Sequence, residues 1–175
     1  MKRLAQCSVA VLFSAFSGLV LAHGKAHVHG KGEMELVVDG GRLSFSLVIP
    51  MESLVGFEHM PKSDAQRAAL VELRDRLGRP EQMLQPNAEG RCIVAESSFE
   101  SPLLSALKGA SGKGGEHSDL NYKVTFQCAE PMKLRTIDLG IMRQHKRLST
   151  LDVQLAGDRG QRATSVRARN PILPL

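Results

Sequence analysis

A tight hairpin is the feature that most constrains the fold of this chain. Residues 33–38 have strand character, and Asp39-Gly40-Gly41 after them is typical of a tight turn between two strands. Hydrophobic and polar residues then alternate over residues 42–49, so one face of that strand is hydrophobic and has to be buried. The residues expected on this face are Leu43, Phe45, Leu47 and Ile49.

The rest of the pattern predicts an α+β fold. Residues 64–77 have leucines at helical spacing, with Ser63 or Asp64 as the N-cap, and a short helical turn is expected within 80–86. Further strands are expected at 91–101, 120–128, 134–142, 151–155 and 164–169, with 54–61 irregular and a glycine-rich loop at 104–116. We therefore expect a single domain over residues 33–175, a mostly antiparallel sheet with one main helix packed on it.

The N-terminus has the pattern of a cleaved export signal. Lys2 and Arg3 precede an apolar run over residues 9–21, which ends in small residues at Ala22 and is too short to span a bilayer comfortably. We expect residues 1–22 to be removed, residues 23–32 to form a flexible arm, and the protein to lie in the periplasm without stable membrane insertion. The formal net charge of +5, part of it in the signal, does not indicate a nucleic-acid partner.

Two cysteines remain after the signal, Cys92 and Cys128. An even count in an oxidising compartment favours a disulfide between them. The alternative is that both bind a metal ion, but neither lies in a C-x-x-C pair, which makes this the weaker interpretation.

Histidines dominate the expected N-terminal arm, where His23, His27 and His29 lie close together. Imidazole is a common ligand for zinc and copper, and His27 and His29 would face the same side of an extended backbone. Metal binding is the favoured interpretation. The alternative is a solvated arm in which the histidines are incidental.

Two other histidines have a carboxylate close by in the sequence: His59 follows Glu58, and His117 is two residues before Asp119. A carboxylate can be a further ligand or can orient a ligating ring, although each pair also fits an ordinary loop or turn. His145 lies in a run of cations and is a poor candidate, because positive charge opposes a divalent ion.

Three classes of function remain open. The first is a metal-binding accessory protein, since the chain has neither H-E-x-x-H on a helix nor a recognisable nucleophile motif, and we expect no enzyme. The second is a copper protein or oxidase in which His23 begins the mature chain and chelates copper through its amine and ring. The low aromatic content (4%) argues against a glycan-acting oxidase of this kind. The third is a structural or partner-binding module.

Several short motifs, in their order along the chain, carry a family resemblance. The motifs are Ala26-His27-Val28-His29-Gly30, Leu54-Val55-Gly56-Phe57-Glu58-His59 before Pro61-Lys62, Glu100-Ser101-Pro102-Leu103, His117-Ser118-Asp119, Leu151-Asp152-Val153-Gln154, Gly160-Gln161, and Asn170-Pro171-x-Leu173-x-Leu175. Together they resemble the zinc-regulated periplasmic zinc-binding proteins of Gram-negative bacteria, the ZrgA-like family. The resemblance implies zinc binding that assists import, with a zinc importer component as partner. It implies His27, His29, His59 and His117 as ligands.

One interval departs from that family pattern. Members often carry a long insert rich in histidine and acidic residues between the Ser-Pro-Leu and His-Ser-Asp motifs, whereas residues 104–116 contain no histidine here. We therefore expect one small, fixed site for Zn²⁺, with Cu²⁺ as the alternative ion, in place of capture of many ions.

Overall fold

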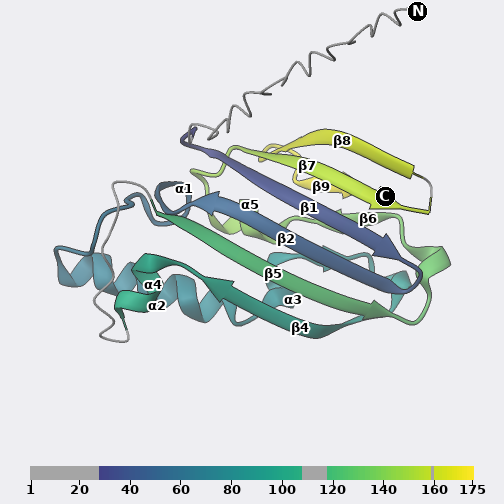
Figure 1. Cartoon of the computed structure of the whole chain (residues 1–175), viewed down its shortest axis with the longest axis horizontal. Helices are drawn as coiled ribbons and strands as arrows, with labels where there is room; N and C mark the ends of the chain where they lie inside the picture. The colour runs from purple at the N-terminus through teal and green to yellow at the C-terminus, as the bar shows by residue number, and fades with distance from the viewer. Residues whose placement is uncertain (1–27, 108–117, 159) are drawn as a thin grey trace, which may run out of the picture.

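The protein is described by a computed structural model that covers residues 28–107, 118–158 and 160–175. Its main layer is a six-stranded sheet with the order β4-β5-β2-β1-β7-β8 (Figure 1). All neighbouring strands are antiparallel except β1 and β7, which are parallel. The strands are β1 (Lys31–Asp39), β2 (Arg42–Pro50), β4 (Cys92–Glu100), β5 (Asp119–Cys128), β7 (Thr150–Gly157) and β8 (Gly160–Arg167).

The hairpin prediction is confirmed. Asp39 pairs with Arg42 across the turn, and Gly40 has a φ of 52°, a left-handed conformation that a side chain disfavours. The alternating hydrophobic residues of β2 all point to one face and are buried, as are those of β5 beside them. One continuous hydrophobic core therefore lies against a single face of the sheet.

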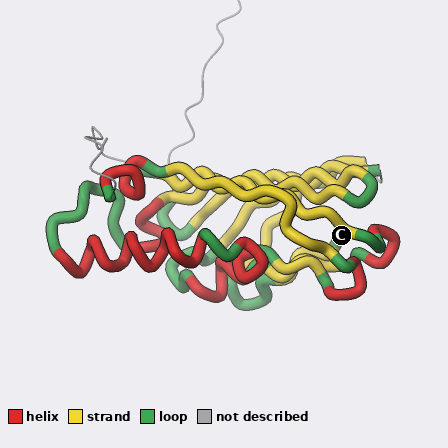
Figure 2. The backbone as a smooth tube through the Cα atoms, turned by 90° about the horizontal axis from the view of Figure 1, so that it is seen from below, coloured by secondary structure: helices red, strands yellow, loops and turns green. Residues whose placement is uncertain are grey.

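A second layer covers that face. Figure 2 shows the helices and a small sheet on one side of the six strands, and no described element lies over the other side. The second layer contains α1 (Met51–Val55), α2 (Asp64–Leu77), α3 (Pro80–Met83), α4 (Pro102–Ala106), α5 (Gly140–Gln144), the 3-10 turns η1 (Ala88–Gly90) and η2 (Pro131–Lys133), and a small sheet in the order β3 (Gln85–Pro86), β6 (Thr136–Asp138), β9 (Ile172–Pro174).

Helix α2 has the N-cap and the buried stripe that the sequence predicts. The Ser63 side chain accepts a hydrogen bond from the Gln66 amide, while Leu70, Leu73 and Leu77 are buried. The helix is also tied to the sheet, because the buried Tyr122 hydroxyl donates to the Leu77 carbonyl at 2.9 Å. None of the helices in the described ranges is long and apolar enough to cross a membrane.

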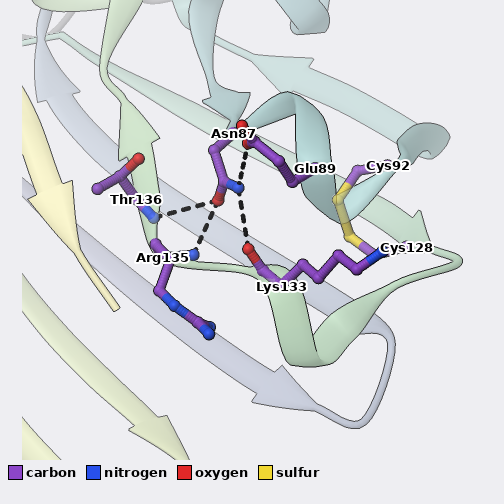
Figure 3. The surroundings of a disulfide bond; sticks show 7 residues. All are labelled: Asn87, Glu89, Cys92, Cys128, Lys133, Arg135 and Thr136. Carbon is purple, nitrogen blue, oxygen red and sulfur yellow. Dashed lines mark hydrogen bonds between the residues drawn. A yellow bond between two sulfur atoms is a disulfide. The ribbon is translucent and has the colours of Figure 1, made fainter.

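The predicted disulfide is confirmed between Cys92 and Cys128, which lie opposite each other on β4 and β5. A second link lies close to it (Figure 3). The Asn87 side chain donates to the Lys133 carbonyl at 3.0 Å and accepts from the amides of Arg135 and Thr136 at 2.8 and 3.2 Å. Together these links join the segment that leads into β4 to the segment between β5 and β6.

Three segments differ from the sequence prediction. A strand over 134–142 is wrong in its second half, where α5 forms, because a short apolar run such as Leu139-Gly140-Ile141-Met142 can be buried as a helix as well as a strand. Gly140 allows α5 to approach α3, since a Cβ there would lie 2.1 Å from the Gln82 carbonyl oxygen. Helix α1 precedes and enters the region expected to be irregular, and α4 occupies the first residues of the expected 104–116 loop. Residues 108–117 of that loop lie outside the described residues.

Candidate metal centre

Helix α1 and the turn after it position Glu58. The helix ends at Gly56, which has a φ of 85° and whose amide donates to the Glu52 carbonyl at 2.9 Å. The chain then turns, buries Phe57 in the core and leaves the Glu58 side chain only 17% exposed. The Glu58 carboxylate is therefore held near the surface by a well-packed turn.

Gly30 anchors the end of the N-terminal arm to α1. Its amide donates to the buried Ser53 hydroxyl at 2.9 Å, and its carbonyl accepts from the amides of Ser149 and Thr150 and from the Ser149 hydroxyl. Gly30 has a φ of 78°, and a Cβ there would lie 3.1 Å from both the Arg147 carbonyl oxygen and the Ser149 hydroxyl, so a side chain is strained and crowded at this position. We name the three residues Gly30, Ser53 and Ser149 the Gly30 clamp.

The clamp brings His29 to Glu58. His29 Nε2 lies 3.8 Å from Glu58 Oε1, and the His29 side chain is 61% exposed. A tetrahedral zinc ion with ligand distances of about 2.0–2.1 Å separates its ligand atoms by about 3.4 Å. The two atoms therefore need to approach by only a few tenths of an ångström to share one ion, so this pair fits zinc.

His59 is the next residue and is exposed. Its Nδ1 lies 2.8 Å from the Met60 carbonyl oxygen, and its ring packs beside the Phe57 ring at a centroid distance of 5.6 Å. Because a carbonyl oxygen only accepts, Nδ1 must donate, and Nε2 then carries the lone pair of the neutral ring. A ligating histidine usually has this arrangement, in which the other ring nitrogen is bonded to a carbonyl or carboxylate.

The start of β5 lies at the same end of the sheet. The Met51 amide at the start of α1 donates to the Ser118 carbonyl at 2.9 Å, and Asp119 lies opposite Pro50 in the register of β5 and β2. Ser118 follows His117 in the sequence, but His117, His23 and His27 lie outside the described residues. Their roles as ligands stay predictions.

Among the described ranges alone, no group of three or more His, Cys, Asp and Glu side chains is placed to hold a metal ion together. The structure therefore brings together two of the residues singled out from the sequence, His29 and Glu58, and places His59 next in the chain. Their other partners would have to come from small shifts of described side chains or from residues outside the described ranges.

His145 lies in the core and not at the surface. It is 6% exposed, its Nδ1 lies 3.0 Å from the Leu54 carbonyl oxygen, and burial lowers the pKa of its ring. The sequence argument set it aside because of neighbouring cations, whereas in the structure its burial is what keeps it from an incoming ion. His145 connects α5 to α1, the helix that positions Glu58.

Sequence reasoning missed the Gly30 clamp. Its residues come from the start of β1, from α1 and from the segment before β7, and nothing in their spacing indicates that they meet. The only local signal is the glycine at position 30, and a single glycine does not indicate a close contact with two other segments.

Comparison with known proteins agrees with the motif resemblance. Residues 26–175 match the family model described as the ZrgA family zinc uptake protein, and this range includes the Gly30 clamp, His29, Glu58 and His59. The comparison with curated proteins finds no match. Because the matched range covers most of the sequence, the chain belongs to the ZrgA family of zinc uptake proteins.

Proposed function

We propose that this protein is a periplasmic zinc-binding accessory protein that assists zinc acquisition or buffering and does not catalyse a reaction. The observation that carries the proposal is the His29–Glu58 pair, whose ligand atoms lie 3.8 Å apart. Membership of a zinc uptake family supports zinc as the ion. The export pattern of residues 1–22 supports the compartment.

In this proposal His29 and Glu58 supply two ligands of one zinc ion. His59 is the third candidate, because its Nδ1 is bonded to a carbonyl and its Nε2 carries the lone pair. His27 and His117 are the remaining candidates, with Asp119 as a ligand or as a hydrogen-bond partner of a ligating ring. Zinc prefers four ligands, so any two of these residues, or one and a water molecule, complete the site.

The exposure of His29 favours transfer over permanent storage. A structural zinc site is closed by four protein ligands, whereas here one candidate ligand is 61% exposed. An ion held at such a site can be passed to a partner, for which a zinc importer component is the proposed candidate. Protons compete with zinc for imidazole nitrogens, so zinc affinity should fall in acid.

Copper(II) is the competing ion. Copper binds nitrogen sites more tightly than zinc, so selectivity for zinc would have to come from geometry or from metal supply. The alternative copper protein would use His23 as its N-terminal residue. It predicts that His23→Ala abolishes tight metal binding while His29→Ala and Glu58→Gln leave it intact.

Zinc titration against a competing chelator at neutral pH tests the proposal. We expect His29→Ala and Glu58→Gln each to weaken zinc binding by about tenfold or more. The matched control is Glu96→Gln, which removes an exposed carboxylate on the edge strand β4 and should stay within about twofold of the original protein. If both site variants bind zinc like the original protein, the site is elsewhere and the proposal is wrong.

A further inference from the structure

His145 is a buried histidine that the proposed zinc site does not use. It is the C-cap residue of α5 and is only 6% exposed. Its Nδ1 lies 3.0 Å from the Leu54 carbonyl oxygen on α1. Because a carbonyl oxygen only accepts, Nδ1 donates this hydrogen bond and carries the proton of the neutral ring. The neutral ring therefore links α5 to α1.

The other ring nitrogen, Nε2 of His145, is buried and has no hydrogen-bond partner among the described residues. Protonation of the ring would place an N–H and a positive charge at this nitrogen. A buried N–H without an acceptor is unfavourable, and a buried charge without a partner is more unfavourable still. The protonated ring is therefore more stable where it reaches water, which requires α1 and α5 to separate locally.

Burial lowers the pKa of His145, and the charged groups around the ring do not reverse this effect. On α2, Arg76 lowers the pKa and Glu72 raises it, and these two residues pair with each other. On α1, Glu52 pairs with Arg147 at 3.4 Å. The elements around the ring also carry Glu81 on α3, and Arg143 and Lys146 in the segment of His145 itself.

Both segments that His145 links also carry the Gly30 clamp. On α1, the carbonyl that its ring binds belongs to the residue directly after Ser53. In the turn after α5, the His145 carbonyl accepts the Leu148 amide at 2.9 Å, and Ser149 follows. A movement of His145 therefore shifts both serines that hold Gly30, and with them the pair of proposed zinc ligands.

We propose that His145 makes the zinc site sensitive to pH, because its protonation opens the Gly30 clamp and speeds the release of zinc. This inference rests on the proposed zinc site at His29 and Glu58. It adds a second effect of acid to the direct protonation of the ligands, at a residue that is not one of the proposed ligands. A carrier with this property holds zinc near neutral pH and releases it faster in acid.

The expected size of the effect follows from the pKa of His145 in two forms of the protein. In the open form the ring reaches water and has the ordinary histidine pKa of about 6.5, whereas burial lowers the pKa in the closed form. As pH falls below about 6.5, the open form therefore binds the proton first and gains in population. At pH 5.5, one unit lower, this gain is at most about tenfold.

Zinc release from the loaded protein into excess chelator, measured at pH 7.0 and pH 5.5, tests the proposal. Acid speeds release in every variant, because protons compete with zinc for the ligands. The variant His145→Asn does not titrate, and its side-chain amide can still donate to the Leu54 carbonyl. We expect acid to speed release from the original protein about three- to tenfold more than from His145→Asn. The matched control Ile141→Val removes a buried methylene from the same helix and keeps His145, so it should respond to acid like the original protein.

A second measurement does not need zinc. Hydrogen exchange of the Gly30 amide reports opening of the clamp in the zinc-free protein. After correction for the pH dependence of exchange itself, the protection of this amide should fall about three- to tenfold from pH 7.0 to pH 5.5 in the original protein and stay constant in His145→Asn. This measurement on the original protein decides the matter if His145→Asn does not fold.

Two results would overturn the proposal: equal acceleration of zinc release by acid in the original protein and in His145→Asn, or protection of the Gly30 amide that is the same at both pH values in the original protein. Failure of the proposed function is recognised separately, by zinc titration of the His29→Ala and Glu58→Gln variants. If zinc does not bind at these residues, the exchange of the Gly30 amide still decides whether His145 opens the clamp.

Discussion

Replacing Ser53 by alanine tests how the site is positioned. The Ser53 hydroxyl is fully buried and accepts the Gly30 amide at 2.9 Å. Leaving that amide without an acceptor should lower the free energy of unfolding by about 1–2 kcal/mol. The Gly30 amide can bond to water again if Gly30 moves away from α1. This movement also takes His29 away from Glu58. If about 1 kcal/mol of the cost falls on the metal-bound state, zinc affinity drops about fivefold.

Ser149→Ala is the matched control for Ser53→Ala. It removes another serine hydroxyl bonded to Gly30, but the Gly30 carbonyl keeps the amide donors of Ser149 and Thr150. We expect its zinc affinity to stay within about twofold of the original protein. Urea unfolding and zinc titration against a chelator measure the two effects separately. The reasoning is refuted if folded Ser53→Ala binds zinc like the original protein, or if both alanine variants lose affinity equally.

Three further predictions concern other parts of the chain. Replacing Cys92 and Cys128 by alanine removes a link between residues 36 apart. In the chain-entropy model this change should lower the free energy of unfolding by about 4 kcal/mol and the Tm by about 8–16 °C. Calorimetry measures the Tm, and an unchanged Tm would contradict the prediction. Zinc stoichiometry should stay the same. Burial lowers the pKa of His145 below that of an unfolded histidine, about 6.5, so the unfolded state binds the proton first as pH falls. The free energy of unfolding should therefore decrease from about pH 6.5 downward until folded His145 is itself protonated, and an equally steep decrease in His145→Gln would show that another group is responsible. Deleting residues 111–115, which contain no imidazole, thiol or carboxylate, should leave zinc stoichiometry unchanged in a metal titration, and a lost equivalent of zinc would contradict this.

Local patterns in the sequence predict the elements that depend on local interactions. The hairpin follows from alternation and a glycine turn, and α2 follows from its Ser63 cap and its leucine stripe. The strand predicted over 134–142 is wrong in its second half, because the short apolar run over 139–142 has no period that separates a strand from a buried helix. Strand order and the parallel pair of β1 and β7 depend on contacts between distant segments, which no local pattern contains.

The candidate site, too, can be predicted from the sequence only in part. The chemistry of histidine and glutamate side chains identifies His29, Glu58 and His59 as candidate ligands from sequence alone. Which of them meet depends on the Gly30 clamp, whose three residues become neighbours only when β1, α1 and the segment before β7 pack together. The sequence therefore indicates the residue types of a zinc site, and the fold determines the pair.

Anomalous diffraction at the zinc edge, from crystals of the zinc-loaded protein, tests the proposed site most directly. We expect a peak bonded to His29 Nε2 at about 2.0–2.1 Å and to a Glu58 carboxylate oxygen at about 2.0–2.2 Å, completed by other histidines or water. A fully occupied zinc peak that contacts neither His29 nor Glu58 would contradict the proposed site.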